Sequence, residues 1–462
     1  MVRSNFSKHY LRYIVMKYLI ILADGAADEP VELLGDKTPL QAARKPYIDR
    51  LAREGVNGRL ITVPEGYHPG SEIAHLGLLG YDISKVFEGR GSLEAASMQV
   101  PIERDEVAMR CNVICLDGDI IKNHSAGNIS TQEADELIKT LNEQLPSFTL
   151  DSGRVVEPSD IRFFTGVSYR HLLKIKGGNK HVSCTPPHDR IGKPWKPELP
   201  KNEYDVFRLN EPITRLSPKE TADLLRKLIL WSQGILANHP VNIKRMAEGK
   251  DPANSIWPWS LGYRPQMQTL MSLFPERVRT GAVISAVDLI FGIGVYCGLD
   301  KVNVPGTTGL WDTNYEGKAD AAIEQLKQKD FVFLHIEATD EAGHDGDAVL
   351  KKTCVEDIDN RVVARILKEV EKWDEPVRIA VLPDHPTPIK YRTHTTSPVP
   401  FVIWQSKPSQ PGDPVAIFAD DVQSYDEDAA AKGALGLMKD DEFIRFFLGE
   451  TLPVPSSKRI VK

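Results

Sequence analysis

Short runs of almost entirely apolar residues recur along the chain, each bounded by Asp, Gly or Pro. They read YLIILADG (18–25), FVFLHIEATD (331–340), VRIAVLPDH (377–385) and VPFVIW (399–404). Their length and their lack of polar alternation are typical of strands buried on both faces of a sheet. Helix-like segments such as 318–328 and 349–370 separate several of these runs. The pattern therefore predicts an α/β fold with a mainly parallel sheet flanked by helices, whose first strand is 17–23.

The middle of the chain has a different texture, with strands expected at 108–121 and 161–175 around a helix at 131–145. A Pro-rich segment, TPPHDRIGKPWKPELPKNEYD (185–205), follows. We expect this region to be a smaller inserted α/β domain. The expected organisation is an N-terminal extension (1–16), a core (17–96 and 216–462) and the inserted domain (97–215).

Composition excludes several classes of partner. The net charge of −7 over 462 residues comes from intermixed acids and bases with no long basic block, so neither a nucleic-acid nor an anionic-membrane surface is expected. Lys17 interrupts the first apolar run and Asp24 ends it, which leaves the run too short to span a membrane. Five scattered cysteines favour a reducing cytoplasm. Local lysines and arginines can still receive a small anionic substrate, and no pattern specifies an oligomer.

Aspartates end three of the apolar runs, at Asp24, Asp340 and Asp384. In open α/β sheets the ligand crevice lies outside the carboxyl edge of the strands, so side chains far apart in sequence can meet there. An Asp-Gly turn also places Asp24 at such a position for backbone reasons alone, and Asp384 is also compatible with a capped turn.

Three histidines accompany these aspartates. His344 follows Asp340 by four residues, which places both on one face of a helical turn, while His385 directly follows Asp384, and His394 comes nine residues later. Each pair alone is also compatible with a solvated loop or a capped turn. Together, three carboxylates and three imidazoles suit two divalent metal ions that share a nucleophile.

Ser71, in YHPGSEIAHL, has two interpretations. As a helix N-cap its hydroxyl would accept a backbone N–H, although Ala74 stands where a capping box needs Glu or Gln. As a nucleophile it would sit at a helix N-terminus that favours phosphate, and a coordinated metal would lower its pKa. The ten residues alone favour the cap; a nearby metal pair would favour the nucleophile.

These segments resemble a known family. Asp24, GSEIAH, DEAGHDGD, PDH and HTTSPVPF occur in the order found in the alkaline phosphatase superfamily, and residues 17–448 resemble the archaeal-type cofactor-independent phosphoglycerate mutases. The resemblance implies an alkaline phosphatase-like core, an inserted substrate domain and a phosphoserine intermediate on Ser71. It also implies two divalent ions, Mn²⁺ first, with Zn²⁺, Mg²⁺ or Co²⁺ as alternatives. The implied ligands are Asp340, His344 and His394 for one ion, and Asp24, Ser71, Asp384 and His385 for the other.

The same resemblance implies contacts to a small phosphorylated substrate. His124, Arg170, and the pair His188 and Asp189 fall in matching segments of the inserted domain, and Lys318 falls in one of the core. Each has a structural alternative, such as a strand-edge charge for Arg170.

One segment departs from the family pattern. Where an Arg-Gly segment is expected, the chain reads SIWPWS (255–260). Loss of a guanidinium is not a conservative change for phosphate or carboxylate recognition. Either the tryptophans are core packing and Arg264 supplies the charge, or the substrate has changed, because this branch resembles proteins proposed to be homoserine kinases.

The sequence thus favours a cytoplasmic phosphoglycerate mutase that interconverts 3- and 2-phosphoglycerate. A homoserine kinase with the same serine and metals is the alternative, although no Walker-type or glycine-rich ATP loop is present. A phosphatase and a non-catalytic binding protein are further alternatives.

Overall fold

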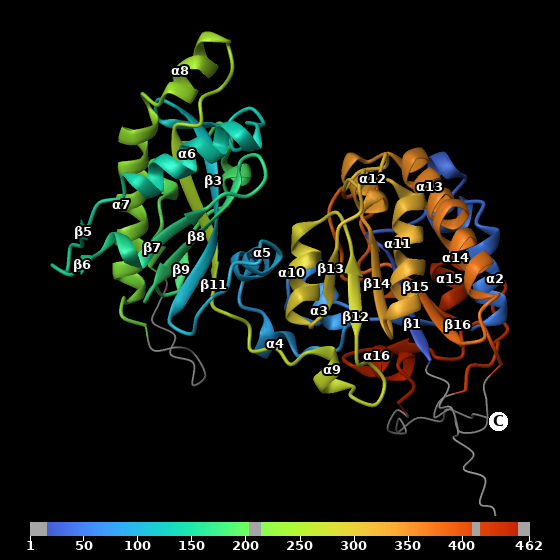
Figure 1. Cartoon of the computed structure of the whole chain (residues 1–462). Coiled ribbons are helices and arrows are strands. Elements are labelled where there is room, and N and C mark those ends of the chain that lie inside the picture. Colours follow the sequence, from blue (N-terminus) through green and yellow to red (C-terminus); the bar gives the residue numbers. More distant parts are fainter. Residues whose placement is uncertain (1–15, 203–213, 409–415, 451–462) are drawn as a thin grey trace, which may run out of the picture. The chain divides into compact units, whose positions relative to one another are not determined.

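The computed structural model describes residues 16–202, 214–408 and 416–450. By its internal contacts the chain divides into two compact units (Figure 1). Among the described residues, unit 1 comprises 16–83, 268–287, 297–408 and 416–450, and unit 2 comprises 84–202, 214–267 and 288–296.

Unit 1 is built on an eight-stranded sheet in the order β13-β12-β14-β1-β15-β16-β2-β17. Pairing is parallel from β13 to β15, and β16 is antiparallel to both of its neighbours. The predicted mainly parallel α/β sheet is therefore confirmed. The strands are β1 (Lys17–Ala23), β2 (Val56–Leu60), β12 (Gly281–Ile284), β13 (Asp300–Val302), β14 (Phe331–Ile336), β15 (Val377–Leu382), β16 (Val399–Gln405) and β17 (Leu437–Met438).

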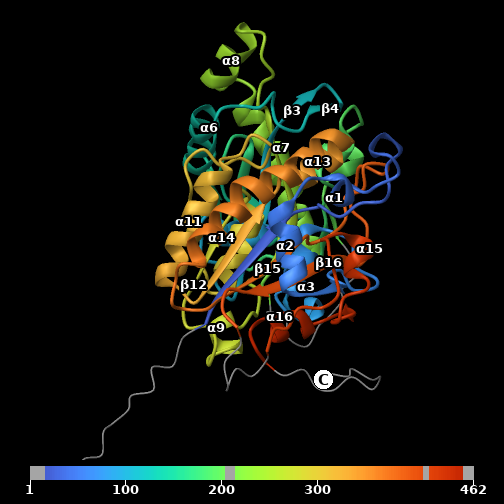
Figure 2. The same cartoon turned by 90° about the vertical axis from the view of Figure 1, so that its right-hand side faces the viewer.

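Helices cover this sheet, and several of them lie side by side along one face in Figure 2. Apolar residues of β1, β14 and β15 pack with those of α2, α11, α13 and α14 in one continuous core. Among the described helices, none has both the length and the apolar composition needed to cross a bilayer. The helices of unit 1 are α1 (Pro39–Ala42), α2 (Pro46–Glu54), α3 (Ser71–Leu78), α9 (Leu270–Leu273), α11 (Tyr315–Gln328), α12 (Ala338–Asp345), α13 (Ala348–Asp357), α14 (Ala364–Val370), α15 (Glu427–Ala430) and α16 (Glu442–Phe447), with a π-helical turn (Ile358–Val363) between α13 and α14.

Unit 2 has an antiparallel sheet in the order β11-β3-β8-β7, with β4 paired to β3. Two short ladders, β5 with β6 and β9 with β10, accompany it. The strands are β3 (Glu106–Asp117), β4 (Ile120–Asn123), β5 (Phe148–Thr149), β6 (Val155–Val156), β7 (Ile161–Phe164), β8 (Arg170–Lys176), β9 (Val182–Ser183), β10 (Lys201–Asn202) and β11 (Ser255–Gly262). The helices are α5 (Arg90–Ser97), α6 (Thr131–Glu143), α7 (Pro218–Leu236), α8 (Pro240–Ala247) and α10 (Asp288–Tyr296), and α4 (Ile83–Val86) spans the boundary between the units.

The compact units do not divide where the sequence pattern changes. The pattern suggested an insertion of 97–215, whereas the contacts assign α5, α7, β11 and α10 to unit 2 as well. The physical reason is long-range pairing, because β11 joins β3 and α7 packs its apolar side on the same sheet. A substrate role for unit 2 and a metal-binding role for unit 1 stay predictions.

Candidate active site

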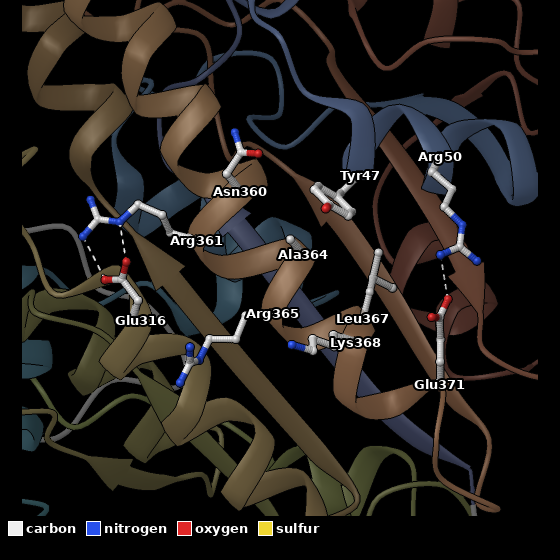
Figure 3. Close-up of a pocket in the computed structure, with 10 residues that line it drawn as sticks. All are labelled: Tyr47, Arg50, Glu316, Asn360, Arg361, Ala364, Arg365, Leu367, Lys368 and Glu371. Carbon is white, nitrogen blue, oxygen red and sulfur yellow. Dashed lines mark hydrogen bonds and ion pairs between the residues drawn. The ribbon is translucent and has the colours of Figure 1, made fainter.

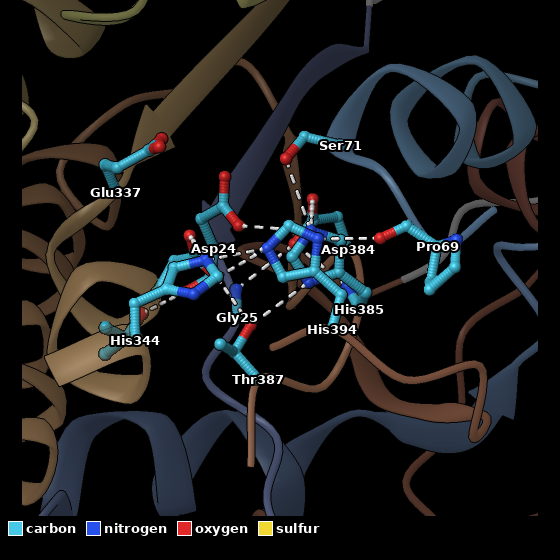
Figure 4. A network of polar contacts seen from close by, with 12 residues as sticks. Asp24, Gly25, Pro69, Ser71, Glu337, His344, Asp384, His385, Thr387 and His394 are labelled. Carbon is cyan, nitrogen blue, oxygen red and sulfur yellow. Dashed lines mark hydrogen bonds and ion pairs between the residues drawn. The ribbon is translucent and has the colours of Figure 1, made fainter. Parts of the chain in front are cut away.

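Ser71 is the first residue of α3 and not its cap. The N-cap is Gly70, with extended backbone angles of φ −101° and ψ 151°, and no side chain caps this helix. The capping interpretation favoured by the isolated sequence is therefore wrong. The Ser71 hydroxyl instead lies 3.2 Å from Nε2 of His385, which leaves it directed at the histidine and aspartate cluster (Figure 4).

Asp24, Asp384 and His385 form the first group of candidate ligands around this hydroxyl. Nε2 of His385 lies 3.2 Å from a carboxylate oxygen of Asp384 and 3.7 Å from one of Asp24. The three side chains are completely buried. The other oxygen of Asp384 accepts backbone N–H groups from Gly25 and His385, so the turn after β1 and the turn after β15 orient this carboxylate together.

Asp340, His344 and His394 form the second group. Asp340 was expected at a strand end, but β14 stops at Ile336 and Asp340 lies in the first turn of α12. The helical spacing with His344 is confirmed, since Nε2 of His344 lies 3.2 Å from one Asp340 oxygen. Nε2 of His394 lies 3.4 Å from the other oxygen.

The two groups are continuous. Nε2 of His344 and Nε2 of His394 are 2.9 Å apart, and the rings of His385 and His394 stack with centroids 3.8 Å apart. Asp340, His385 and His394 also satisfy the spacing of a metal site, as do Asp24, Asp384 and His385. All six predicted ligands and Ser71 thus meet in unit 1.

Two buried histidines of this site were missed by the sequence reasoning. His75 lies one turn after Ser71 on α3, with Nδ1 2.7 Å from the Ser71 carbonyl oxygen and 3.3 Å from Asp384. His335 lies inside β14, with Nε2 2.7 Å from Asp24 and Nδ1 2.9 Å from the Ser285 hydroxyl. The four-residue spacing from Ser71 was a usable signal for His75, whereas nothing in the apolar run distinguished His335.

Charge in this site is poorly balanced. Burial, and then repulsion from Asp384, raises the pKa of Asp24 well above its usual value. Burial and the nearby Asp340 raise the pKa of Glu337 to about 8. Burial would also raise the pKa of Asp340, but hydrogen bonds with His344 and His394 outweigh it and hold this pKa well below its usual value. The Asp340 hydrogen bond in turn raises the pKa of His344 to about 9.

Several buried oxygens here lack hydrogen bonds. Among the described residues, one carboxylate oxygen each of Asp24, Glu337 and Asp384 accepts no hydrogen bond of good geometry, although an imidazole nitrogen lies 3.2–3.7 Å from each. Nε2 of His75 also has no hydrogen-bond partner. Buried polar atoms are rarely left unpaired, because each costs about 1–3 kcal/mol. Acceptors of this kind, gathered among imidazoles, fit divalent cations such as Mn²⁺ or Zn²⁺. The donor set therefore fits a metal centre.

The substrate residues predicted for the inserted domain gather within unit 2. The His124 and His188 rings lie 6.0 Å apart, and the His124 ring lies 5.5 Å from that of Tyr169. Arg170 is exposed at the start of β8, with its guanidinium 5.6 Å from the Tyr169 ring. Asp189 is exposed beside His188. Their roles stay predictions.

Lys318 and Arg264 have contrasting environments. Lys318, on α11 in unit 1, is completely buried and donates to the main-chain carbonyl of His335, and burial lowers its pKa to about 8. Arg264 follows β11 in unit 2 and is exposed. Burial of Tyr296 raises the pKa of its hydroxyl to about 12, and the positive charge of Arg264 opposes this shift. Contacts of either residue with substrate stay predictions.

The SIWPWS segment is strand β11, at an edge of the unit 2 sheet. An edge position tolerates Pro258, which has no N–H for a ladder. Trp257 and Trp259 are 1% and 5% exposed and pack in one cluster with Trp195. Their indole N–H groups donate to the Thr185 carbonyl and to the Asn112 side chain. The tryptophans are thus core packing, as one of the two interpretations expected.

A surface pocket of about 500 Å³ lies elsewhere on unit 1, beside α14 (Figure 3). Three of its cations are already paired: Arg361 with Glu316, Arg365 with an aspartate of α11, and Arg50 with Glu371. This pocket contains none of the predicted site residues, and its paired charges do not indicate an anion site.

Comparisons with known proteins give the family of this chain. Residues 52–242 match the family model for 2,3-bisphosphoglycerate-independent phosphoglycerate mutase. A protein of that name from Methanosarcina acetivorans is 45% identical, over 93% of this chain and 98% of its own. The chain belongs to the 2,3-bisphosphoglycerate-independent phosphoglycerate mutase family.

Solved structures support the same assignment. A cofactor-independent phosphoglycerate mutase from Thermoplasma acidophilum superimposes with a TM-score of 0.60 at 26% identity, over 94% of this chain and 99% of that one. A protein from Pyrococcus horikoshii gives a TM-score of 0.74 at 27% identity, over 96% of this chain and all of that one. The alkaline phosphatase-like α/β fold predicted from sequence is thereby confirmed.

Proposed function

We propose that this enzyme interconverts 3-phosphoglycerate and 2-phosphoglycerate through a phosphoserine formed on Ser71, without added bisphosphoglycerate. The observation that carries the proposal is the position of the Ser71 hydroxyl, 3.2 Å from His385 at the start of a helix and close to buried carboxylates that each keep one oxygen without a hydrogen bond. The family assignment supports the same reaction. Because the hydroxyl is not used as a cap, it is available for chemistry.

Two divalent ions, with Mn²⁺ as the first candidate, would be held by the two groups of side chains. Asp340, His344 and His394 would hold one ion, and Asp24, Ser71, Asp384 and His385 the other. When bound, such a pair lowers the pKa of a coordinated hydroxyl and neutralises charge that develops on the transferred phosphoryl group. His75 and His335 lie behind the ligands Asp384 and Asp24, so we assign them to positioning those carboxylates.

The phosphoryl group is transferred in two steps, first to Ser71 and then back to the substrate. Ser71 Oγ loses its proton and attacks phosphorus, the bond from phosphorus to the substrate C3 oxygen breaks, and that oxygen becomes a hydroxyl by gaining a proton. The C2 hydroxyl then loses its proton and attacks the phosphoserine, which restores the Ser71 hydroxyl and yields 2-phosphoglycerate. Backbone N–H groups at the start of α3 favour the negative charge of the phosphoryl group in both steps.

Six side chains are candidates for substrate binding. His124, Arg170, His188, Asp189 and Arg264 are the candidates in unit 2, and Lys318 is the candidate in unit 1. The proposed partner is this small phosphorylated substrate, and five scattered cysteines favour the cytoplasm as the location of the reaction.

The test is a two-substrate assay with purified protein and Mn²⁺. Isomerisation of 3-phosphoglycerate, coupled to enolase and without bisphosphoglycerate, is the expected result. A silent mutase assay together with phosphohomoserine formation from ATP and homoserine would replace this proposal with the homoserine kinase alternative. Phosphate release as fast as isomerisation would indicate a phosphatase, and absence of bound metal would indicate a binding protein.

A further inference from the structure

Thr387 lies between the two groups of candidate metal ligands in unit 1. It is completely buried in the segment that follows β15 (Figure 4). Its hydroxyl donates to a carboxylate oxygen of Asp340 at 2.5 Å, and the Thr387 hydroxyl oxygen also lies 3.3 Å from Nδ1 of His385. Asp340 belongs to one group and His385 to the other, so a single side chain contacts both groups.

The number of available protons decides the direction of these contacts. A threonine hydroxyl has one proton and a carboxylate can only accept, so this proton goes to Asp340. The Thr387 oxygen can then only accept from His385, which places the imidazole proton on Nδ1 and leaves a lone pair on Nε2. Nε2 lies 3.2 Å from the Ser71 hydroxyl and 3.2 Å from an Asp384 oxygen. An imidazole lone pair beside a carboxylate oxygen is an arrangement that a shared divalent cation satisfies.

Close backbone contacts hold the Thr387 side chain in this position. A Cβ atom on Gly25, which has a φ of +60°, would lie 2.6 Å from the Thr387 hydroxyl oxygen. A Cβ atom on Gly343 would lie 2.8 Å from the Thr387 methyl carbon and 2.5 Å from its carbonyl oxygen. Gly25 directly follows Asp24, and Gly343 directly precedes His344. The main chain beside a ligand of each ion is therefore packed tightly against this threonine.

A buried lysine fixes the main chain at the same residue. Nζ of Lys351 donates to the Thr387 carbonyl at 2.8 Å and to the Ala27 carbonyl at 3.2 Å. It also forms an ion pair with Asp28 at 2.7 Å. The Thr387 N–H in turn donates to the Ala27 carbonyl. The Lys351 ammonium thus uses its three protons inside the protein, and it ties the segment after β15 to the turn after β1.

We propose that Thr387 is a positioning residue that orients one ligand of each metal ion at the same time. The inference rests on the proposed function, which assigns Asp340 to one ion and His385 to the other. The Thr387 hydroxyl directs the Asp340 carboxylate, and it fixes the tautomer of His385 so that the Nε2 lone pair is available to the ion. Because one hydroxyl makes both contacts, its loss weakens the binding of both ions.

The experiment compares variants that differ mainly by this hydroxyl. Thr387→Val replaces the hydroxyl with a methyl group of similar size, and Thr387→Ser keeps the hydroxyl. Binding of Mn²⁺ to the metal-free, full-length proteins would be measured by titration calorimetry. Thr387→Val should weaken the binding of both ions about 10- to 100-fold, the range for residues that orient metal ligands, whereas Thr387→Ser should stay within about 3-fold of the unmodified protein.

Two controls separate this effect from a general loss of stability. Thr387→Ser and Thr387→Ala form a second pair that differs by the hydroxyl alone, and this pair carries the test if Thr387→Val does not fold. Thr221→Val is the matched control, because Thr221 is a completely buried threonine of unit 2 whose hydroxyl accepts from the Asn179 N–H. It should lower the melting temperature and leave the Mn²⁺ affinity unchanged.

Several results would overturn the inference. These are weaker binding of one ion only, unchanged affinity when the hydroxyl is removed, a loss that Thr387→Ser shares, and a loss of equal size in Thr221→Val. An unmodified protein that binds no Mn²⁺ would overturn it as well. The titration involves no substrate, so failure of the proposed function would appear separately, as absent isomerisation by the unmodified enzyme at saturating Mn²⁺.

Discussion

The two units carry polar clusters of opposite sign. Among the described residues, the buried atoms without hydrogen bonds in the unit 1 site include carboxylate oxygens of Asp24, Glu337 and Asp384, whereas in unit 2 they include the donor Nε atoms of Arg90 and Arg110. In each cluster, a ligand of opposite charge would satisfy the atoms that lack hydrogen bonds. The comparison indicates that the charge of a bound ligand can be inferred from the atoms left without hydrogen bonds, and for the unit 1 site these atoms favour cations.

The largest expected effect comes from removing the nucleophile of the unit 1 cluster. Ser71→Ala should lower kcat for isomerisation by about 10⁴-fold or more, as loss of a covalent nucleophile does elsewhere. Steady-state assays with 3-phosphoglycerate measure it. Ser147→Ala, which alters an exposed serine of unit 2, is the control and should leave kcat unchanged. Normal turnover by Ser71→Ala would contradict the proposal, because Ser71 in the unit 1 cluster would then not be the nucleophile.

Metal content tests the sign assigned to unit 1. Asp340→Asn should bind one metal ion instead of two, and its activity should fall at least about 100-fold. Substituting residues that only orient metal ligands already lowers metal affinity or activity by up to about 100-fold. Elemental analysis after dialysis measures the stoichiometry. Asp345→Asn, an exposed aspartate of the same helix, should keep both ions. Two ions retained in Asp340→Asn would refute the ligand assignment.

A smaller effect on metal binding is expected from His335, which contacts the proposed ligand Asp24. His335→Gln should weaken metal binding about 10-fold, because His335 orients Asp24 from 2.7 Å without joining the ligand set. Metal titration of the apo protein measures the affinity. Excess Mn²⁺ should restore most of the activity, and a loss that metal cannot rescue would place His335 in the chemistry itself.

The smallest effect belongs to unit 2. Trp259→Phe should raise the KM for 3-phosphoglycerate a few-fold, with kcat little changed. The substitution weakens the contact between the Trp259 ring and the Arg110 guanidinium, 4.6 Å away, and cation–π contacts contribute about 1 kcal/mol. Trp231→Phe, in α7 of the same unit, provides the matched control. An unchanged KM in Trp259→Phe would show that the Trp259 indole does not contribute to substrate binding.

The sequence predicted the parts of this molecule that local pattern determines. Strand β1 has the bounds predicted for it, 17–23, and the four-residue spacing of Asp340 and His344 placed them together on α12. It did not reveal that Gly70 caps α3, because Ser and Gly are both favoured at that position.

Features that depend on long-range pairing could not be predicted. The partnership of Arg110 with Trp259 follows from the antiparallel pairing of β3 with β11, which are far apart in the chain. His335 is hidden within an apolar strand, and its role follows only from the position of Asp24 on the neighbouring strand. Residues that act through another side chain leave no spacing signal of their own.

The most direct test of the account is detection of the phosphoserine. The Mn²⁺-loaded enzyme would be mixed with 3-phosphoglycerate, quenched in acid at short times, digested and analysed by peptide mass spectrometry. The account predicts phosphate on the peptide that contains Ser71, formed no later than 2-phosphoglycerate and absent after chelation of the metal. Isomerisation that proceeds while the Ser71 peptide stays unmodified at every time point would contradict it.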